Sequence, residues 1–135
     1  MISNPPQGYP RISPYLDYED VGAMRAWLSR AFGLVERHRQ KTPNGKVLHA
    51  EMVLEEGVGM MGWPGPEFRN PRNLGQVTQS LYVYVDNLDA HYARSRNAGA
   101  ETIEGPADQP YGDRRYGVAD PEGHRWYFAS RRAAC

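Results

Sequence analysis

The clearest pattern in this chain is an apolar–polar alternation that is followed, twice, by apolar positions at helical spacing. Residues 12–18 and 79–85 alternate with a period of two and predict strands. Residues 20–32 predict a helix because apolar side chains recur there every three or four positions, and residues 87–98 predict another with Leu88, His91, Tyr92 and Ser95 on one side. A glycine follows each helix-like stretch directly, as is common at helix C-termini. The same strand-then-helix order therefore occurs once in each half of the chain.

Shorter strand-like stretches follow each predicted helix, separated by turn-forming residues such as Thr42–Gly45 and Asp120–Gly123. These strands are predicted over residues 34–35, 46–54, 58–63, 101–103, 113–119 and 124–129. Each half thus has the order β-α-β-β-β, and a half of roughly 66 residues is too small to bury a core alone. We expect a first module at about residues 9–64, a Gly-, Pro- and Asn-rich linker at 65–76, and a second module at about 77–130.

Composition and charge narrow the range of partners. The 135 residues suit one globular domain, and sixteen Lys and Arg balance sixteen Asp and Glu. This balance counts against nucleic acid or an anionic membrane as a partner, because phosphate binding needs surplus cations. No apolar run approaches the ~20 residues of a transmembrane helix, and the first residues do not have the apolar stretch of a signal peptide, so a cytoplasmic protein is expected. The one cysteine, Cys135, excludes an intrachain disulfide.

Several short motifs, taken together in their order and spacing, resemble one family. They are Ala31-Phe32-Gly33, Tyr82-Val83-Tyr84-Val85-Asp86-Asn87, Ala98-Gly99-Ala100, Tyr111-Gly112-Asp113-Arg114-Arg115 and Asp120-Pro121-Glu122-Gly123-His124. From about Ile12 to Ser130 the chain resembles the vicinal oxygen chelate superfamily, also called the glyoxalase, bleomycin-resistance and dioxygenase superfamily. The resemblance implies an α+β fold in which two βαβββ modules form a curved sheet around a cleft.

The resemblance also implies where a metal ion is bound in the metal-dependent members. Four strand positions, two in each module, hold the ion there through His, Gln or Glu. In this chain the corresponding positions are Ser13, Met61, Ser80 and Tyr127. These side chains are poor ligands for divalent ions, which prefer carboxylate, imidazole or solvent oxygen in a defined geometry. We therefore expect no metal and no cofactor.

Two other groups of polar residues are candidates for chemistry. His49 and Glu51 alternate with apolar Ala50 and Met52, so both are expected to point toward the cleft. A histidine and a carboxylate on one strand face can shuttle a proton or bind a metal, although a polar pair on a half-exposed strand has the same pattern. The charge cluster at residues 113–115 predicts a solvated hairpin, in which Arg115 could reach the cleft and hold a ligand carboxylate.

The tyrosines are placed as a ligand site would need them. Tyr15, Tyr82, Tyr84 and Tyr127 fall on the predicted concave faces, Trp63 and Tyr111 lie near the rims, and Asp17 adds a polar group. Aromatic rings with a few polar groups suit a planar or amphipathic organic ligand. The alternative is that the rings fill the space of an absent metal and substrate.

The resemblance and the aromatic residues together favour metal-free binding of a small organic molecule, as in the bleomycin-resistance branch. The first alternative is a lyase, isomerase or dioxygenase of the same superfamily that uses His49 and Glu51, and the second is a regulatory or structural partner protein. A homodimer is also expected, because Trp63, Phe68, Met60 and Met61 form an apolar group around the mid-chain loop.

The donor set at the four superfamily positions generates a first prediction. Protein purified without chelator should contain less than about a tenth of an equivalent of Ni, Zn, Mn or Fe, because these side chains offer no competitive ligand set. Elemental analysis measures this directly. Stoichiometric metal whose affinity falls in Glu51→Ala would instead favour an enzyme of the superfamily that uses His49 and Glu51.

Overall fold

The computed structural model describes residues 2–132 in two compact units. The first unit contains the chain up to Ser29 together with Gly33–Phe68, and the second contains Arg30–Phe32 together with the chain from Arg69 onward. Within the described residues, no helix has both the length and the apolar character needed to cross a bilayer. Cys135, on which the disulfide argument rested, lies outside the described residues.

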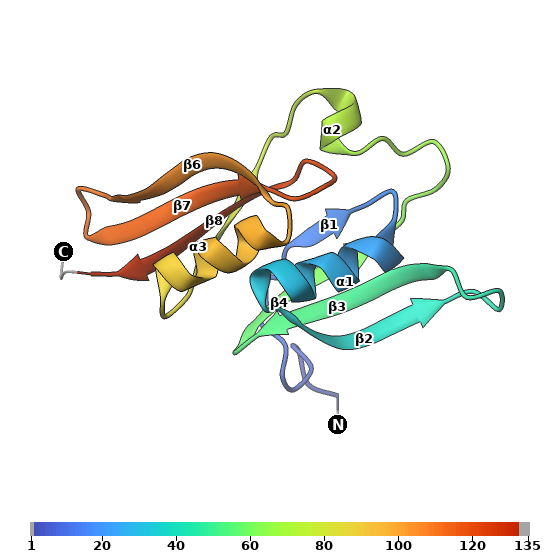
Figure 1. Ribbon diagram of the computed structural model, residues 1–135. Helices are drawn as coiled ribbons and strands as arrows, with labels where there is room; N and C mark the ends of the chain where they lie inside the picture. The colour runs from blue at the N-terminus through green and yellow to red at the C-terminus, as the bar shows by residue number, and fades with distance from the viewer. Residues whose placement is uncertain (1, 133–135) are drawn as a thin grey trace. The chain divides into compact units, whose positions relative to one another are not determined.

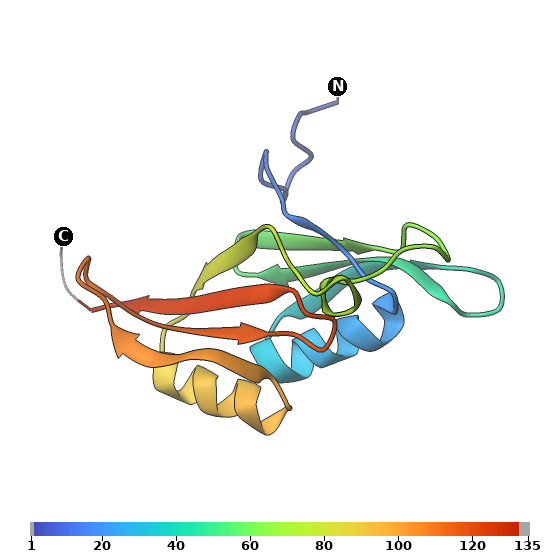
Figure 2. The ribbon, with the colours of Figure 1, turned by 90° about the horizontal axis from the view of Figure 1, so that it is seen from above.

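The first unit is a four-stranded sheet with one helix. Its elements are β1 (Tyr15–Asp17), α1 (Val21–Phe32), β2 (Val35–Lys41), β3 (Val47–Leu54) and β4 (Gly57–Gly62). The strands lie in the order β1-β4-β3-β2, in which β1 is parallel to β4 and the other pairs are antiparallel. Helix α1 runs along one face of this sheet (Figures 1 and 2).

The second unit repeats this topology. Its elements are α2 (Pro71–Leu74), β5 (Ser80–Tyr84), α3 (Leu88–Asn97), β6 (Glu101–Asp108), β7 (Asp113–Ala119) and β8 (Arg125–Arg131). The strand order is β5-β8-β7-β6, with β5 parallel to β8. Helix α3 covers one face of this sheet (Figure 2). The α+β fold with two βαβββ modules is therefore confirmed.

Both long helices begin at side chains that satisfy free backbone amides. Asp20 accepts a hydrogen bond from the Ala23 amide at 2.9 Å, and Asn87 accepts one from the Ala90 amide at 3.2 Å. Helix α1 ends at Gly33, whose φ of 79° is the left-handed conformation that glycine adopts without a steric penalty. The predicted helix boundaries are thus correct at both ends of α1.

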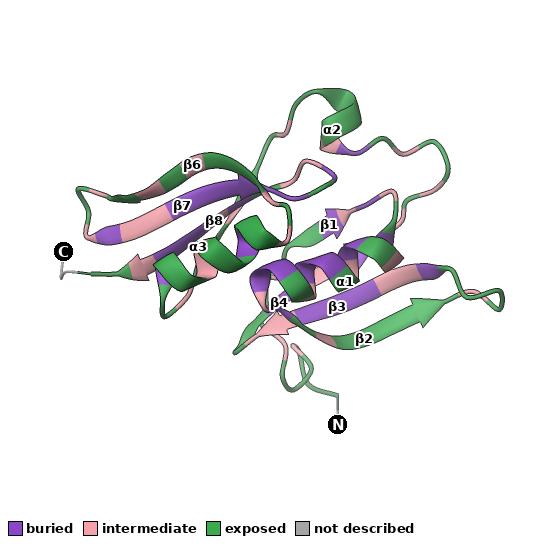
Figure 3. Ribbon diagram, in the orientation of Figure 1, coloured by how far each residue is buried: buried purple, intermediate pink, exposed green. Residues whose placement is uncertain are grey.

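In each unit the inner strands β3 and β7 are the most buried, whereas the edge strands β2 and β6 are mostly exposed, as the coloured ribbon shows (Figure 3). The buried side chains of the first unit include Leu16, Ala50, Met52 and Met61 from the strands and Met24, Trp27 and Leu28 from α1. Those of the second unit include Tyr116, Val118, Trp126 and Phe128, and Phe32 from the last turn of α1 packs on Phe128 at a ring distance of 4.7 Å. Helices α1 and α3 each cover one face of the sheet in their unit, and we call the opposite face of each sheet the open face.

Two strands are several residues longer than predicted, and one short helix was not predicted. Strand β2 extends to Lys41 and β6 extends to Asp108, whereas the sequence predicted only residues 34–35 and 101–103. Both are edge strands whose residues are mostly exposed, so they need no alternation of apolar residues. Helix α2 lies in the predicted linker and begins at Asn70, whose side chain caps the Asn73 amide.

The contrast between packed and open faces generates a prediction about stability. Trp27 is only 7% exposed on α1, whereas Tyr127 is half-buried on the open face of the second unit. Trp27→Ala should cost about 3–5 kcal/mol of unfolding free energy, because it leaves a cavity in the core. Tyr127→Ala should cost less than half as much, because water can reach the vacated space. Denaturant midpoints measure both, and equal losses would mean that the Tyr127 ring is core packing.

Candidate functional site

Four tyrosines lie together on the open face of the second unit. Tyr82 and Tyr84 lie on β5, Tyr127 lies opposite Tyr82 on β8, and Tyr111 lies in the loop before β7. Tyr82 is 42% exposed, Tyr84 is 55% exposed and Tyr111 is 44% exposed. The rings of Tyr82 and Tyr84 meet edge to face, with centroids 5.6 Å apart. The predicted placement of Tyr82, Tyr84 and Tyr127 on one face is therefore correct.

A buried carboxylate holds this group of rings in place. Asp113 is 1% exposed, and its Oδ2 accepts hydrogen bonds from the hydroxyls of Tyr82 at 2.7 Å and Tyr84 at 2.9 Å. Its Oδ1 forms an ion pair with Nε of Arg131 at 3.2 Å. The expectation of a solvated charge cluster at residues 113–115 is therefore wrong for Asp113. The reason is that the strand turns this side chain inward beneath the two tyrosines.

The protonation states of the group follow from these contacts. The hydrogen bond from Tyr82 lowers the pKa of the Asp113 carboxyl below its ordinary value; burial opposes this, and Tyr84 and Arg131 add to the lowering. Burial and the contacts with Tyr111 and Asp113 raise the pKa of Tyr82. The hydrogen bond to Asp113, followed by burial, raises the pKa of Tyr84. At neutral pH both phenols are thus protonated donors to an ionised carboxylate.

Arg115 is on the same face, as predicted, but its charge is already paired with Glu104. Its guanidinium contacts both oxygens of Glu104, at 2.8 Å and 3.3 Å, and it donates to the Tyr111 hydroxyl at 3.1 Å. Its Cζ lies 5.1 Å from the centre of the Tyr127 ring. The bond to Glu104 raises the pKa of Arg115 further above its ordinary value. A ligand carboxylate would have to compete with Glu104 for this arginine.

Glycine makes room for one of these rings. A Cβ at Gly117 on β7 would come within 2.6 Å of the Tyr127 ring, which therefore lies directly over the neighbouring strand. The first unit uses the same device, because a Cβ at Gly62 would come within 2.3 Å of the Tyr15 hydroxyl. Any larger residue at either glycine would push the tyrosine off the sheet.

The open face of the first unit carries the predicted histidine–carboxylate pair. His49 Nε2 lies 3.5 Å from Oε2 of Glu51, and His49 Nδ1 lies 3.1 Å from the Tyr15 hydroxyl. Glu51 is 7% exposed, because Tyr9 covers it and donates its hydroxyl proton to Oε1 at 2.7 Å. Arg37 lies 3.4 Å from the same oxygen. His49 and Glu51 therefore do point to one face, where neighbouring side chains already engage them.

These contacts determine what Glu51 can do chemically. Burial alone would raise the pKa of the Glu51 carboxyl, but hydrogen bonds from Tyr9, His49 and Arg37, with the charge of Arg37, hold it below its ordinary value. A carboxylate with a lowered pKa is a weak base and is not protonated at neutral pH. These contacts therefore leave Glu51 a poor acceptor for a proton at neutral pH.

The same contacts bear on a metal ion at this face. Within residues 2–132, no three His, Cys, Asp or Glu side chains lie close enough to hold one. One oxygen of Glu51 is bonded to a phenol and an arginine, whereas a divalent ion needs it free. The described residues do not fit a metal, and the metal content of the protein remains a prediction.

The structure corrects one of the four positions taken from the resemblance. Met61 is 1% exposed in the core of the first unit, and its neighbour Met60 lies on the open face opposite Tyr15 and Glu51. Ser13 is half-buried before β1, and Ser80 is exposed at the start of β5. Met61 is therefore not part of the apolar surface group expected around the mid-chain loop. The other three members, Met60, Trp63 and Phe68, are only half-exposed.

Two predicted ligand-binding residues have contacts of their own. Asp17 is half-buried at the end of β1. Trp63 is half-buried after β4, with Nζ of Lys46 stacked 3.4 Å from the centre of its ring. The sequence analysis missed four residues that hold the charged groups of the two open faces. They are Tyr9, Arg37, Glu104 and Arg131. None of these residues belongs to an alternating stretch or a motif, so no signal in the sequence pointed to them.

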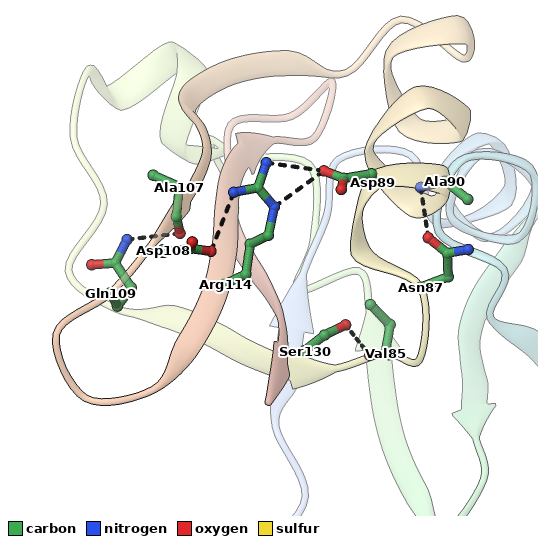
Figure 4. A network of polar contacts seen from close by, with 9 residues as sticks. All are labelled: Val85, Asn87, Asp89, Ala90, Ala107, Asp108, Gln109, Arg114 and Ser130. Carbon is green, nitrogen blue, oxygen red and sulfur yellow. Dashed lines mark hydrogen bonds and ion pairs between the residues drawn. The ribbon is translucent and has the colours of Figure 1, made fainter. Parts of the chain in front are cut away.

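A separate polar hollow lies beside the start of α3 in the second unit, and Figure 4 shows Asn87, Asp89, Arg114 and Ser130 from its lining. It measures about 310 Å³ and is lined by Asp86, Asn87, Leu88, Asp89, Arg114, Ser130, Arg131 and Arg132. The Arg114 guanidinium lies 3.3 Å from Asp89 and 3.3 Å from Asp108, so two carboxylates balance its charge. The open-face tyrosines do not line this hollow.

The fold and these residues define a glyoxalase-like protein, and comparison with known proteins agrees. The family model described as the Glyoxalase/Bleomycin resistance protein/Dioxygenase superfamily matches residues 16–128. The chain therefore belongs to this superfamily. An uncharacterised Mycobacterium tuberculosis protein, Rv0887c, is 33% identical over 122 residues, which cover 87% of this chain and 72% of that protein.

Solved structures give the same result. TioX from Micromonospora sp. ML1 is 32% identical, with a TM-score of 0.75, over 89% of this chain and 97% of that one. The fosfomycin resistance protein FosX from Listeria monocytogenes shares the fold at 14% identity, with a TM-score of 0.65, over 96% of this chain and 94% of that one.

The Asp113 contacts generate a prediction about pH. Because the folded state lowers the pKa of Asp113, its contribution to stability is present above the unfolded pKa of about 3.9 and is lost as pH falls through the lower folded pKa. Asp113→Asn should be less stable at neutral pH and should lose less stability on acidification than the wild type. Unfolding midpoints between about pH 7 and 2.5 test this. Asp108→Asn, at an exposed carboxylate, is the control, and an unchanged pH slope in Asp113→Asn would contradict the prediction.

Proposed function

We propose that this protein binds a small planar organic molecule on the open face of the second unit, without a metal ion. The observation that carries the proposal is the group of half-exposed tyrosine rings whose hydroxyls are fixed on buried Asp113. A sheet face turned to water is ordinarily charged or rich in threonine. Exposed rings on such a face mark a site for a partner or a ligand.

The fixed hydroxyls favour binding because they lower its entropic cost. Tyr82 and Tyr84 are each anchored at the far end of the ring, so little side-chain freedom remains to be lost when a ligand stacks on them. Tyr127 is held over Gly117 and beneath Arg115. The rings therefore form a stacking surface that exists before the ligand arrives.

The polar groups narrow the class of ligand. Arg115 and Arg131 adjoin the rings and are paired with Glu104 and Asp113. Because these ion pairs already balance the charges of the two arginines, an anionic ligand is not favoured. Each tyrosine hydroxyl has one proton, and Tyr82 and Tyr84 donate theirs to Asp113. Toward a ligand these hydroxyls can only accept hydrogen bonds. The site thus suits a neutral aromatic molecule that carries N–H or O–H donors on its edge.

A thermal-shift screen of planar aromatic antibiotics and hydroxylated aromatic metabolites, carried out in excess EDTA, tests the proposal. A ligand at a hundredfold excess over its Kd stabilises the folded state by about 2.7 kcal/mol, which is several degrees of Tm. For each ligand found, Tyr84→Ala and Tyr82→Ala should each weaken binding at least about tenfold, because each removes part of the stacking surface.

Ile103→Ala is the matched control, since Ile103 is a similarly exposed apolar side chain on β6 of the same unit. It should leave the Kd unchanged. Binding that survives both tyrosine variants would place the site elsewhere, and ligands that stabilise the protein only when the same screen is run without EDTA would refute the metal-free part of the proposal.

A further inference from the structure

The first residues of the chain contact the open face of the first unit's sheet. Residues 2–13 form no helix or strand, and we call this segment the N-terminal strap. The strap lies on the side of the first unit's sheet opposite α1 (Figure 2). It is joined to the sheet through Gly8 and Tyr9, because Arg37 donates to the Gly8 carbonyl at 3.0 Å and Tyr9 donates to Glu51.

Both parts of the Tyr9 phenol have a partner on the sheet: the hydroxyl bonds to a carboxylate, and the ring lies beneath a guanidinium. Its hydroxyl is 2.7 Å from Oε1 of Glu51, and the Arg37 guanidinium lies over the ring, 4.1 Å from its centre. The carboxylate is itself held by His49 on its other oxygen. The sheet supplies every one of these partners, and the strap supplies only the phenol.

The geometry points to a phenol-binding site on the open face of the first unit that Tyr9 occupies from within the same chain. The site consists of Glu51 as hydrogen-bond acceptor, Arg37 as the stacking cation and His49 as the group that orients the carboxylate. A ligand with an aromatic hydroxyl binds there by displacing the strap. This site uses none of the residues of the tyrosine face proposed above, so either proposal can fail without the other.

A tethered side chain competes strongly with a free ligand. Tethering gives Tyr9 an effective concentration in the millimolar range or above, so a free phenol must overcome a site that is mostly filled. The apparent affinity for a free phenol falls in proportion to the fraction of time that the strap is open. If the strap is closed about nine-tenths of the time, removing the Tyr9 ring raises that affinity about tenfold.

The test uses p-cresol, which has the structure of a tyrosine side chain, and follows the amide signals of Arg37 and Glu51 by NMR. Tyr9→Ala should bind p-cresol at least about tenfold more tightly than the wild type, with saturable shifts at these amides. Toluene, which lacks the hydroxyl, should bind Tyr9→Ala at least about tenfold more weakly than p-cresol does, because it makes no bond to Glu51. Glu51→Gln in the Tyr9→Ala background should reduce the difference between the two probes.

Two further variants keep the result unambiguous. Tyr9→Phe retains the ring and loses only the hydroxyl, so it should fold normally and bind p-cresol with an affinity between those of the wild type and Tyr9→Ala. Tyr92→Ala removes another tyrosine that has an arginine over its ring and a hydroxyl bonded to Thr102, and it should leave p-cresol binding at Arg37 and Glu51 unchanged.

The proposal is overturned if p-cresol binds the wild type, Tyr9→Phe and Tyr9→Ala with the same Kd, or if toluene binds as tightly as p-cresol. It is also overturned if p-cresol shifts only the amides of Tyr82 and Tyr84. That last result would support the tyrosine face of the second unit and leave the strap with no ligand to displace.

Discussion

A buried carboxylate must be paired, and the open face of each sheet in this protein is arranged around one. Leaving a carboxylate uncompensated in the interior costs several kcal/mol, so the surrounding residues have to supply donors and positive charge. Asp113 receives two tyrosine hydroxyls and Arg131, and Glu51 receives a tyrosine hydroxyl, His49 and Arg37. The positions of Tyr9, Tyr82 and Tyr84 follow from this requirement.

The two open faces meet this requirement in different ways, and they therefore differ in how a ligand could bind to them. In the second unit the donors to Asp113 come from a strand of the sheet, so the stacking surface is permanent and only its outer side is available. In the first unit the phenol donor to Glu51 comes from the N-terminal strap, which no ladder of backbone hydrogen bonds holds in the sheet. A strand cannot leave without breaking the sheet, whereas a strap can. In the two proposals, the open face of the second unit thus binds a ligand without losing a contact, whereas the open face of the first unit binds one in exchange for Tyr9.

The fold could be predicted because alternation and capping are local properties of the sequence. Asp20, Asn87 and Gly33 mark helix ends through contacts within a few residues, and the strands that bury one face repeat apolar residues with a period of two. Met61 shows where local reasoning fails. Gly57 is already paired with Leu54 as the first residue of β4, whereas Gly123 lies in a turn before β8 begins. Counting four residues from each glycine therefore reaches the core face in one unit and the open face in the other.

The site could be predicted only in part, because its rings are periodic and the groups that hold them are not. The alternation of β5 places Tyr82 and Tyr84 on one face, yet nothing in it shows that their hydroxyls meet an aspartate from a strand 29 or 31 residues away. Glu51 and Tyr9 are separated by 42 residues, and Tyr9 lies in a segment without regular structure. Contacts of this kind are decided by which donor can reach a buried charge once the sheet has formed. The burial of Asp113 was missed for the same reason as the donors to Asp113 and Glu51, because both depend on contacts between residues far apart in the chain.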